Sequence, residues 1–195
     1  DFAMKMALAL LPALAMAAGC SSQPEEQETA PELTFHEIMK DEIDPRADEV
    51  WAIGNAAIDD DAGLDPARMS DADWTGLETH SLSLRRAALD LAGLDPVVVT
   101  RPGVMIADEG VPFGDSAADV QAHIDADPQG MRDMANALAA HMADLARAAQ
   151  NHDVARAGPL INQLDGVCEN FHLEFWYPSQ RELVEQFRQI DEADG

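Results

Sequence analysis

The fold is decided by residues 153–178, which read DVARAGPLINQLDGVCENFHLEFWYP. Apolar side chains recur there at steps of three and four residues, which is the pattern of an amphipathic helix that buries one face. The predicted buried face comprises Ala157, Leu160, Ile161, Leu164, Val167, Cys168, Phe171 and Phe175. We expect the helix to begin after Asp153, to become regular about one turn later because of Gly158-Pro159, and to end before Pro178.

Three further amphipathic segments precede this one, with predicted starts at Thr34, Ser70 and Asp127. The first segment runs to Ile58 and contains Pro45, which removes one backbone hydrogen bond and predicts a kink. Ser70 and Asp73 predict a capping box at the start of the second segment. Asp127 followed by Pro128 predicts an N-cap and first turn for the third. The four helix starts are therefore defined by local sequence.

Four such helices with few strand signals predict an all-α fold, an antiparallel up-down-up-down four-helix bundle over residues 34–178. A long connection, Asp95–Asp127, joins helices 2 and 3. Structureless stretches of this length are unusual in a compact domain, and a short helix is expected at Ala117–Ile124. Residues 179–195 form a predicted amphipathic tail with a short C-terminal helix.

The beginning of the chain resembles a bacterial lipoprotein signal. Lys5 precedes an apolar run, residues 6–18, and small residues lead to Cys20. The run is shorter than the roughly 20 residues that a membrane-spanning helix needs. The resemblance implies a signal peptide over 1–19, a lipidated cysteine and flexible tether over 20–33, and a periplasmic protein anchored through Cys20, with the outer membrane favoured.

The net charge of −25 argues against nucleic acid and anionic lipid surfaces as partners, and it favours a basic partner or simply a solvated acidic surface. Cys168 is the only other cysteine, so it has no disulfide partner if Cys20 carries lipid. An unpaired thiol in an oxidising compartment is expected to be buried or attached to another group.

The stretch Cys168-Glu169-Asn170-Phe171-His172 differs by one residue from Cys-x-x-Cys-His, the attachment motif of c-type haem. Phe171 stands where the second cysteine belongs. Cys168 and His172 are four residues apart, so they share one face of the helix. One helix can therefore hold the edge of a haem and also ligate its iron.

With this motif at the end of the fourth helix, residues 34–178 resemble class II cytochrome c, the cytochrome c-prime type. The resemblance implies electron transfer, with His172 as the proximal iron ligand and Met39, early in helix 1, as the distal ligand. The second thiol is missing, which leaves open a single thioether through Cys168, non-covalent haem, or no haem. Phe171 would then pack against the porphyrin or fill part of the pocket.

The alternative function is a haem-less bundle that serves as a binding or structural subunit of a membrane-associated complex. An empty haem cavity would be costly, so such a protein must fill it with large side chains such as Phe175, Trp176 and Trp51.

A zinc or copper site at Cys168 and His172 lacks further ligands. No nucleophile–base pair or phosphate loop is present, so we do not expect an enzyme. Five other histidines follow no ligand spacing and are expected at the surface or at helix caps: His36, His80, His123, His141 and His152.

Overall fold

A computed structural model describes residues 32–58, 63–107, 109–112 and 114–194. The predicted signal peptide, Cys20 and nearly all of the predicted tether lie outside these residues. Among the helices that are described, none has both the length and the apolar character needed to cross a membrane.

The described residues are all-helical and contain no β-strand, although an isolated bridge pairs Ile58 with Leu64. The elements, in chain order, are α1 (Phe35–Ile38), a π-helix (Met39–Ile43), α2 (Asp44–Ala57), a 3-10 turn (Pro66–Arg68), α3 (Asp71–Ala92), α4 (Ala117–Ala126), α5 (Pro128–Gln150), α6 (Val154–Phe171), a second π-helix (His172–Trp176), a second 3-10 turn (Pro178–Gln180) and α7 (Arg181–Asp194). The prediction of an all-α protein is confirmed.

The predicted helix starts are confirmed by their caps. The Asp73 N–H donates to Ser70 Oγ at 3.2 Å, while the Ser70 N–H donates to Asp73 Oδ2 at 2.9 Å. Asp127 Oδ1 accepts from the Gly130 N–H at 2.9 Å, at the start of α5. Asp153 caps α6 in the same way. These caps satisfy N–H groups that the first turn of a helix leaves without intrahelical partners.

The two prolines differ in their effects. Residues 35–57 stay helical through α1, the π-helix 39–43 and α2, and Ile38, Ile43 and Asp44 all have right-handed helical dihedral angles. Pro45 therefore lies inside this stretch and removes one backbone donor, as predicted, and the π-helix that ends at Ile43 interrupts the α-helical pattern just before it. Residues 154–171 form one α-helix through Pro159, so the predicted delay at Gly158-Pro159 is wrong. Pro159 leaves only the carbonyl of Ala155, in the first turn, without its helical donor.

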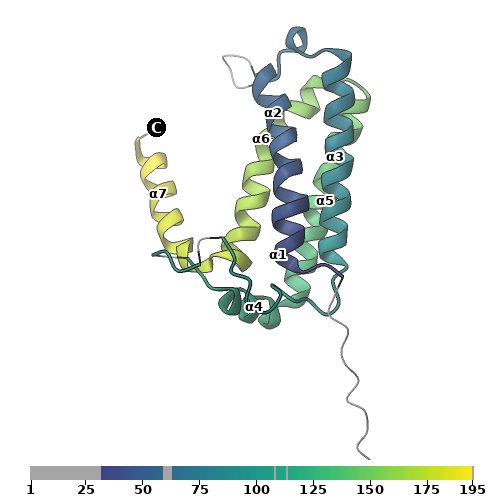
Figure 1. The fold of residues 1–195 in the computed structure, drawn as a ribbon. Helices are drawn as coiled ribbons and strands as arrows, with labels where there is room; N and C mark the ends of the chain where they lie inside the picture. The colour runs from purple at the N-terminus through teal and green to yellow at the C-terminus, as the bar shows by residue number, and fades with distance from the viewer. Residues whose placement is uncertain (1–31, 59–62, 108, 113, 195) are drawn as a thin grey trace, which may run out of the picture. The chain divides into compact units, whose positions relative to one another are not determined.

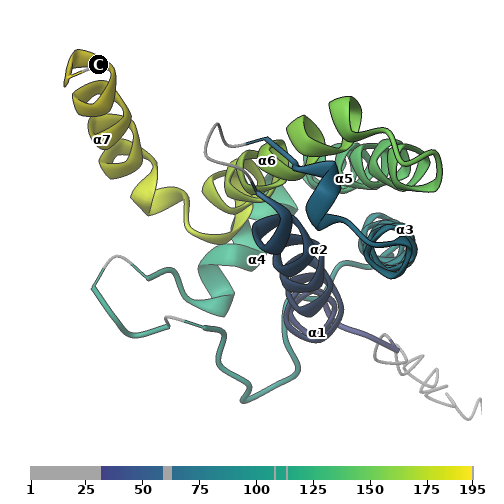
Figure 2. The ribbon, with the colours of Figure 1, turned by 90° about the horizontal axis from the view of Figure 1, so that it is seen from above.

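The long helices enclose the core. Figure 1 shows α2, α3, α5 and α6 side by side with roughly aligned axes, and Figure 2 shows them from above. α3 packs along α5, α5 also packs on α6, and α2 contacts α3 and α6. Among the fully buried side chains between them are Val50, Leu77, Leu84, Leu91, Met131, Met142, Leu145 and Leu164. Burial of these apolar faces is the main stabilising contribution.

The connection between α3 and α5 supports the start of α1. The carbonyls of Val98 and Val99 accept from the Phe35 and His36 N–H groups, both at 2.9 Å. Thr34 adds a capping box with Glu37. The connection ends in α4, where a short helix was predicted, and α4 contacts both α5 and the π-helix 172–176. The connection therefore holds the ends of two elements that line the candidate site.

Candidate functional site

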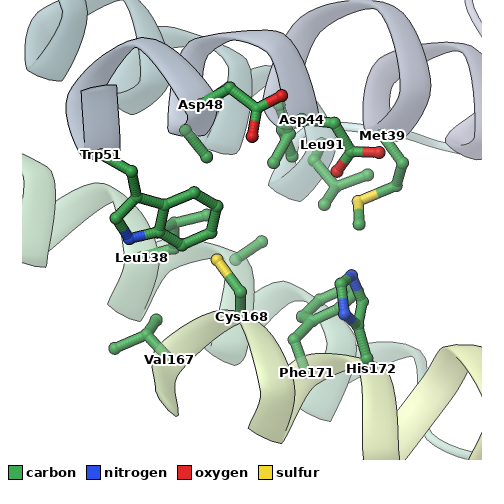
Figure 3. A pocket seen from close by; sticks show the side chains of 13 residues that line it. Met39, Asp44, Asp48, Trp51, Leu91, Leu138, Val167, Cys168, Phe171 and His172 are labelled. Carbon is green, nitrogen blue, oxygen red and sulfur yellow. The ribbon is translucent and has the colours of Figure 1, made fainter. Parts of the chain in front are cut away.

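A cavity of about 290 Å³ lies between the first helical stretch and α6. All four residues singled out from the sequence line it: Met39, Cys168, Phe171 and His172. Figure 3 shows two walls, with Met39 and Trp51 on one and Cys168, Phe171 and His172 on the other. The structure therefore brings together residues that are far apart in the chain. We call this space the first cavity.

Both predicted ligands begin a π-helical segment. Met39 is the first residue of the π-helix 39–43, and His172 is the first residue of the π-helix 172–176. Their carbonyls accept from residues five positions further on: Asp44 N–H donates to Met39 O, and Tyr177 N–H donates to His172 O at 2.8 Å. The wide turn therefore places Asp44 next to Met39 in the first segment and Tyr177 next to His172 in the second. Such π-bulges are rare and are frequent at functional sites.

The His172 ring is held in place, and its surroundings favour the neutral imidazole. Its Nδ1 lies 3.2 Å from the Tyr177 hydroxyl. Burial lowers the pKa of His172, against the opposing effects of Asp165 and Glu169. In the tautomer in which Nδ1–H donates to Tyr177, Nε2 carries the free lone pair that a metal ion requires. A hydrogen bond of this kind orients an imidazole ligand and tunes its basicity.

The Cys168 side chain is a half-buried thiol with no disulfide. Burial raises its pKa to about 12, with smaller contributions from the charges of Asp44 and Asp165. The thiol is therefore protonated at neutral pH, and it lacks the thiolate character of a reactive or metal-binding cysteine. The expectation that this thiol would be shielded within the fold agrees with its position.

Phe171 belongs to an aromatic cluster at one end of the first cavity. Its ring stacks on Phe35 at 6.0 Å and lies tilted against Phe175 at 5.5 Å, while Phe35 also stacks on Trp176 at 5.6 Å. These contacts follow the expectation that large side chains occupy part of a haem-less pocket. They do not fill it, because the first cavity remains beside Phe171 and Trp51.

Two carboxyl groups were missed by sequence reasoning. Asp44 and Asp48 line the first cavity, and both keep exposed surface at its rim. Partial desolvation by the surrounding protein raises the pKa of Asp44, Asp48 raises it further, and His36 opposes the shift. Both aspartates belong to an acidic stretch that is typical of a solvated helix face, so nothing in the sequence indicated that they line a cavity.

His36 was predicted at the surface or at a cap, and that prediction is wrong. It is buried, and its ring lies 6.1 Å from that of Trp176. It lines a second cavity of about 500 Å³, which shares Met39, Asp44 and His172 with the first. The two cavities therefore adjoin along the line between the two predicted ligands.

Comparison with known proteins identified no relative of this chain. No protein-family model, curated protein or solved structure matches this chain. The site is consequently interpreted from its own geometry.

The donor atoms of the site limit its chemistry. In the described part of the chain, no group of three or more His, Cys, Asp or Glu side chains could hold a metal ion. The first cavity instead offers one imidazole, one thioether and mostly apolar walls. A bare metal ion would lack ligands there, whereas an organic group with a large apolar surface would match the walls.

Proposed function

We propose that this protein binds haem in the first cavity, non-covalently or through one thioether at Cys168, and transfers electrons. The observation that carries the proposal is that one cavity is lined at once by Met39, Cys168 and His172. Met39 comes from the first helical stretch, whereas Cys168 and His172 come from α6 and the π-helix that follows it. A mostly apolar cavity on which a few polar groups converge is the usual form of a ligand site.

The dimensions and lining of the site support a haem. The first cavity, of about 290 Å³, is near the lower end of the roughly 300–1,000 Å³ typical of ligand sites. The adjoining second cavity adds about 500 Å³. Apolar walls for a porphyrin ring come from Trp51, Leu91, Leu138 and Val167. Such walls favour a ligand with a large apolar body.

The protein's own residues would set the properties of the bound group. His172 supplies a neutral nitrogen whose direction is held by Tyr177, and Met39 supplies a soft sulfur from the opposite wall. Haem supplies a one-electron redox couple when it is bound, and a His/Met pair suits electron transfer because it leaves no open position for a substrate. Phe171 provides no second thiol, so covalent attachment is limited to Cys168.

The proposal includes the architecture and the location. We infer that α1–α2, α3, α5 and α6 form the up-down-up-down bundle of class II cytochrome c, with the haem site near the end of the last long helix.

We also infer that Cys20 is lipidated and anchors the protein on the periplasmic side of a bacterial membrane, where a basic protein or a membrane complex exchanges electrons with it. Cys20→Ser should release the protein from membranes, and continued sedimentation with membranes would contradict the anchor.

The decisive experiment is a titration of the purified protein with haem, followed by absorbance. One equivalent should bind and give a Soret band with six-coordinate low-spin features. His172→Ala should weaken binding strongly, while Met39→Ala should retain haem with a high-spin spectrum. His80→Ala is the matched control, because this histidine pairs with Glu49 and does not line either cavity.

Two results would contradict the proposal. One is an absence of haem binding by the unaltered protein. The other is binding by His172→Ala that equals that of the unaltered protein. Either result would leave the haem-less alternative, a bundle that serves as a binding or structural subunit of a membrane-associated complex.

A further inference from the structure

Lysine is almost absent from this protein. The chain has 37 acidic residues against 12 Lys and Arg, and its only lysines are Lys5 and Lys40. Lys40 is also the only lysine within the described residues, and it lines the second cavity beside His36 and Tyr177. The chain is strongly acidic, and the fold does not need a cation at the rim of the candidate site. The position of Lys40 therefore calls for a functional explanation.

Lys40 differs from most of the described arginines in having no ion-pair partner among the residues that the structure describes. Arg46 pairs with Glu42 at 2.6 Å and Arg101 pairs with Glu37 at 2.8 Å. Within the described ranges, no carboxylate lies within ion-pair distance of the Lys40 ammonium, and the side chain is exposed. Its charge is therefore available to a ligand.

The two cavities differ in the chemistry of their walls. The first is walled by Trp51, Leu91 and other apolar side chains. The second carries the imidazole of His36, the hydroxyl of Tyr177 and the Lys40 ammonium. Asp44 lines both cavities, so it lies where they meet. A ligand that is apolar at one end and anionic at the other matches this division.

We propose that Lys40 contacts the carboxylate edge of the bound ligand in the second cavity, so that the opposite, apolar edge lies toward Trp51 and Cys168. The inference rests on the proposed function, in which these carboxylates are the two propionates of haem. It assigns an orientation to the ligand, and it places the vinyl-bearing edge on the side of the single thiol.

The test compares haem with its dimethyl ester, which has the same ring and no carboxylate charge. Dissociation constants for both are measured by absorbance titration at low salt with the unaltered chain, Lys40→Met and Lys40→Arg. Arg85→Met is the matched control, because Arg85 is also an exposed cation without a described ion pair and lies outside both cavities.

Lys40→Met should weaken haem binding by about two- to fivefold, the range of a partly exposed ion pair, and leave ester binding unchanged. Lys40→Arg and Arg85→Met should keep the ratio of the two affinities. Equal effects of Lys40→Met on haem and ester, or no effect on either, would overturn the orientation while leaving the haem proposal in place. If neither compound binds the unaltered chain, the proposed function fails, and this inference fails with it.

Discussion

Gly54 is a point of close approach between α2 and α6, and its substitution by alanine tests how tightly these two walls of the site pack. A Cβ atom at Gly54 would lie 2.7 Å from Cγ2 of Ile161, which is closer than packed carbon atoms approach. Ile161 is buried in α6, and the atom in question is its branch methyl, so it cannot simply rotate into solvent. Either the helices separate or Ile161 leaves its preferred rotamer.

The expected magnitude is the balance of two effects. Gly to Ala within a helix gains about 1 kcal/mol from propensity. Overpacking a filled core costs about 1–3 kcal/mol, so Gly54→Ala should be neutral to destabilising by about 2 kcal/mol. Gly166 lies in α6, and a Cβ there meets no atom within 4 Å. Gly166→Ala should therefore stabilise by about 0.4–1 kcal/mol.

Urea and thermal unfolding of the two variants measure the difference directly. About 0.4–3 kcal/mol should separate Gly54→Ala from Gly166→Ala, and each kcal/mol corresponds to about 2–4 °C in Tm for a protein of this size. In an Ile161→Ala background the cost of Gly54→Ala should disappear, because the obstructing methyl is gone. If Gly54→Ala instead stabilises the protein as much as Gly166→Ala does, α2 and α6 do not approach at this point.

Three further predictions concern charge and the motif. The Arg101 side chain and the Thr34 backbone N–H lower the pKa of Glu37 to about 2, from an ordinary 4.5. The stabilisation from its ionised form is present above pH 4.5 and lost as pH falls toward 2, so Glu37→Gln should flatten that part of an acid-unfolding curve. Because the pKa of Cys168 is raised to about 12, iodoacetamide at pH 8 should alkylate the folded protein far more slowly than the urea-unfolded chain; equal rates would contradict the burial. Phe171→Cys completes the attachment motif with His172, and mass spectrometry after expression with the attachment machinery should show covalent haem, whereas a colourless, folded variant would mean that the cavity cannot admit it.

Features encoded by short-range interactions were predicted well. The caps at Ser70, Asp127 and Asp153 act within three residues of themselves, so helix starts could be identified from sequence. The four-residue spacing of Cys168 and His172 predicted that they share one face, and both line the first cavity. Met39 was selected through the resemblance to class II cytochrome c, and the same cavity contains it.

Features that depend on distant contacts or on irregular turns were missed. The periodicity argument assumes 3.6 residues per turn, so it could not foresee the π-helix 39–43 or the placement of Asp44 beside Met39. His36 is buried because Val99, far along the chain, accepts from its N–H and because Trp176 covers its ring. Lys40 belongs to no ligand motif in the sequence, and its proposed role comes only from its position at the second cavity.

The measurement that tests the central claim most directly is the absorbance spectrum of the full-length protein, purified from cells that make haem, before and after reduction. A Soret band that shifts on reduction and is absent from His172→Ala is the predicted result. Mass spectrometry of the denatured protein should then show either the mass of the polypeptide alone or that mass plus one haem. A colourless protein that also takes up no added haem would contradict the account.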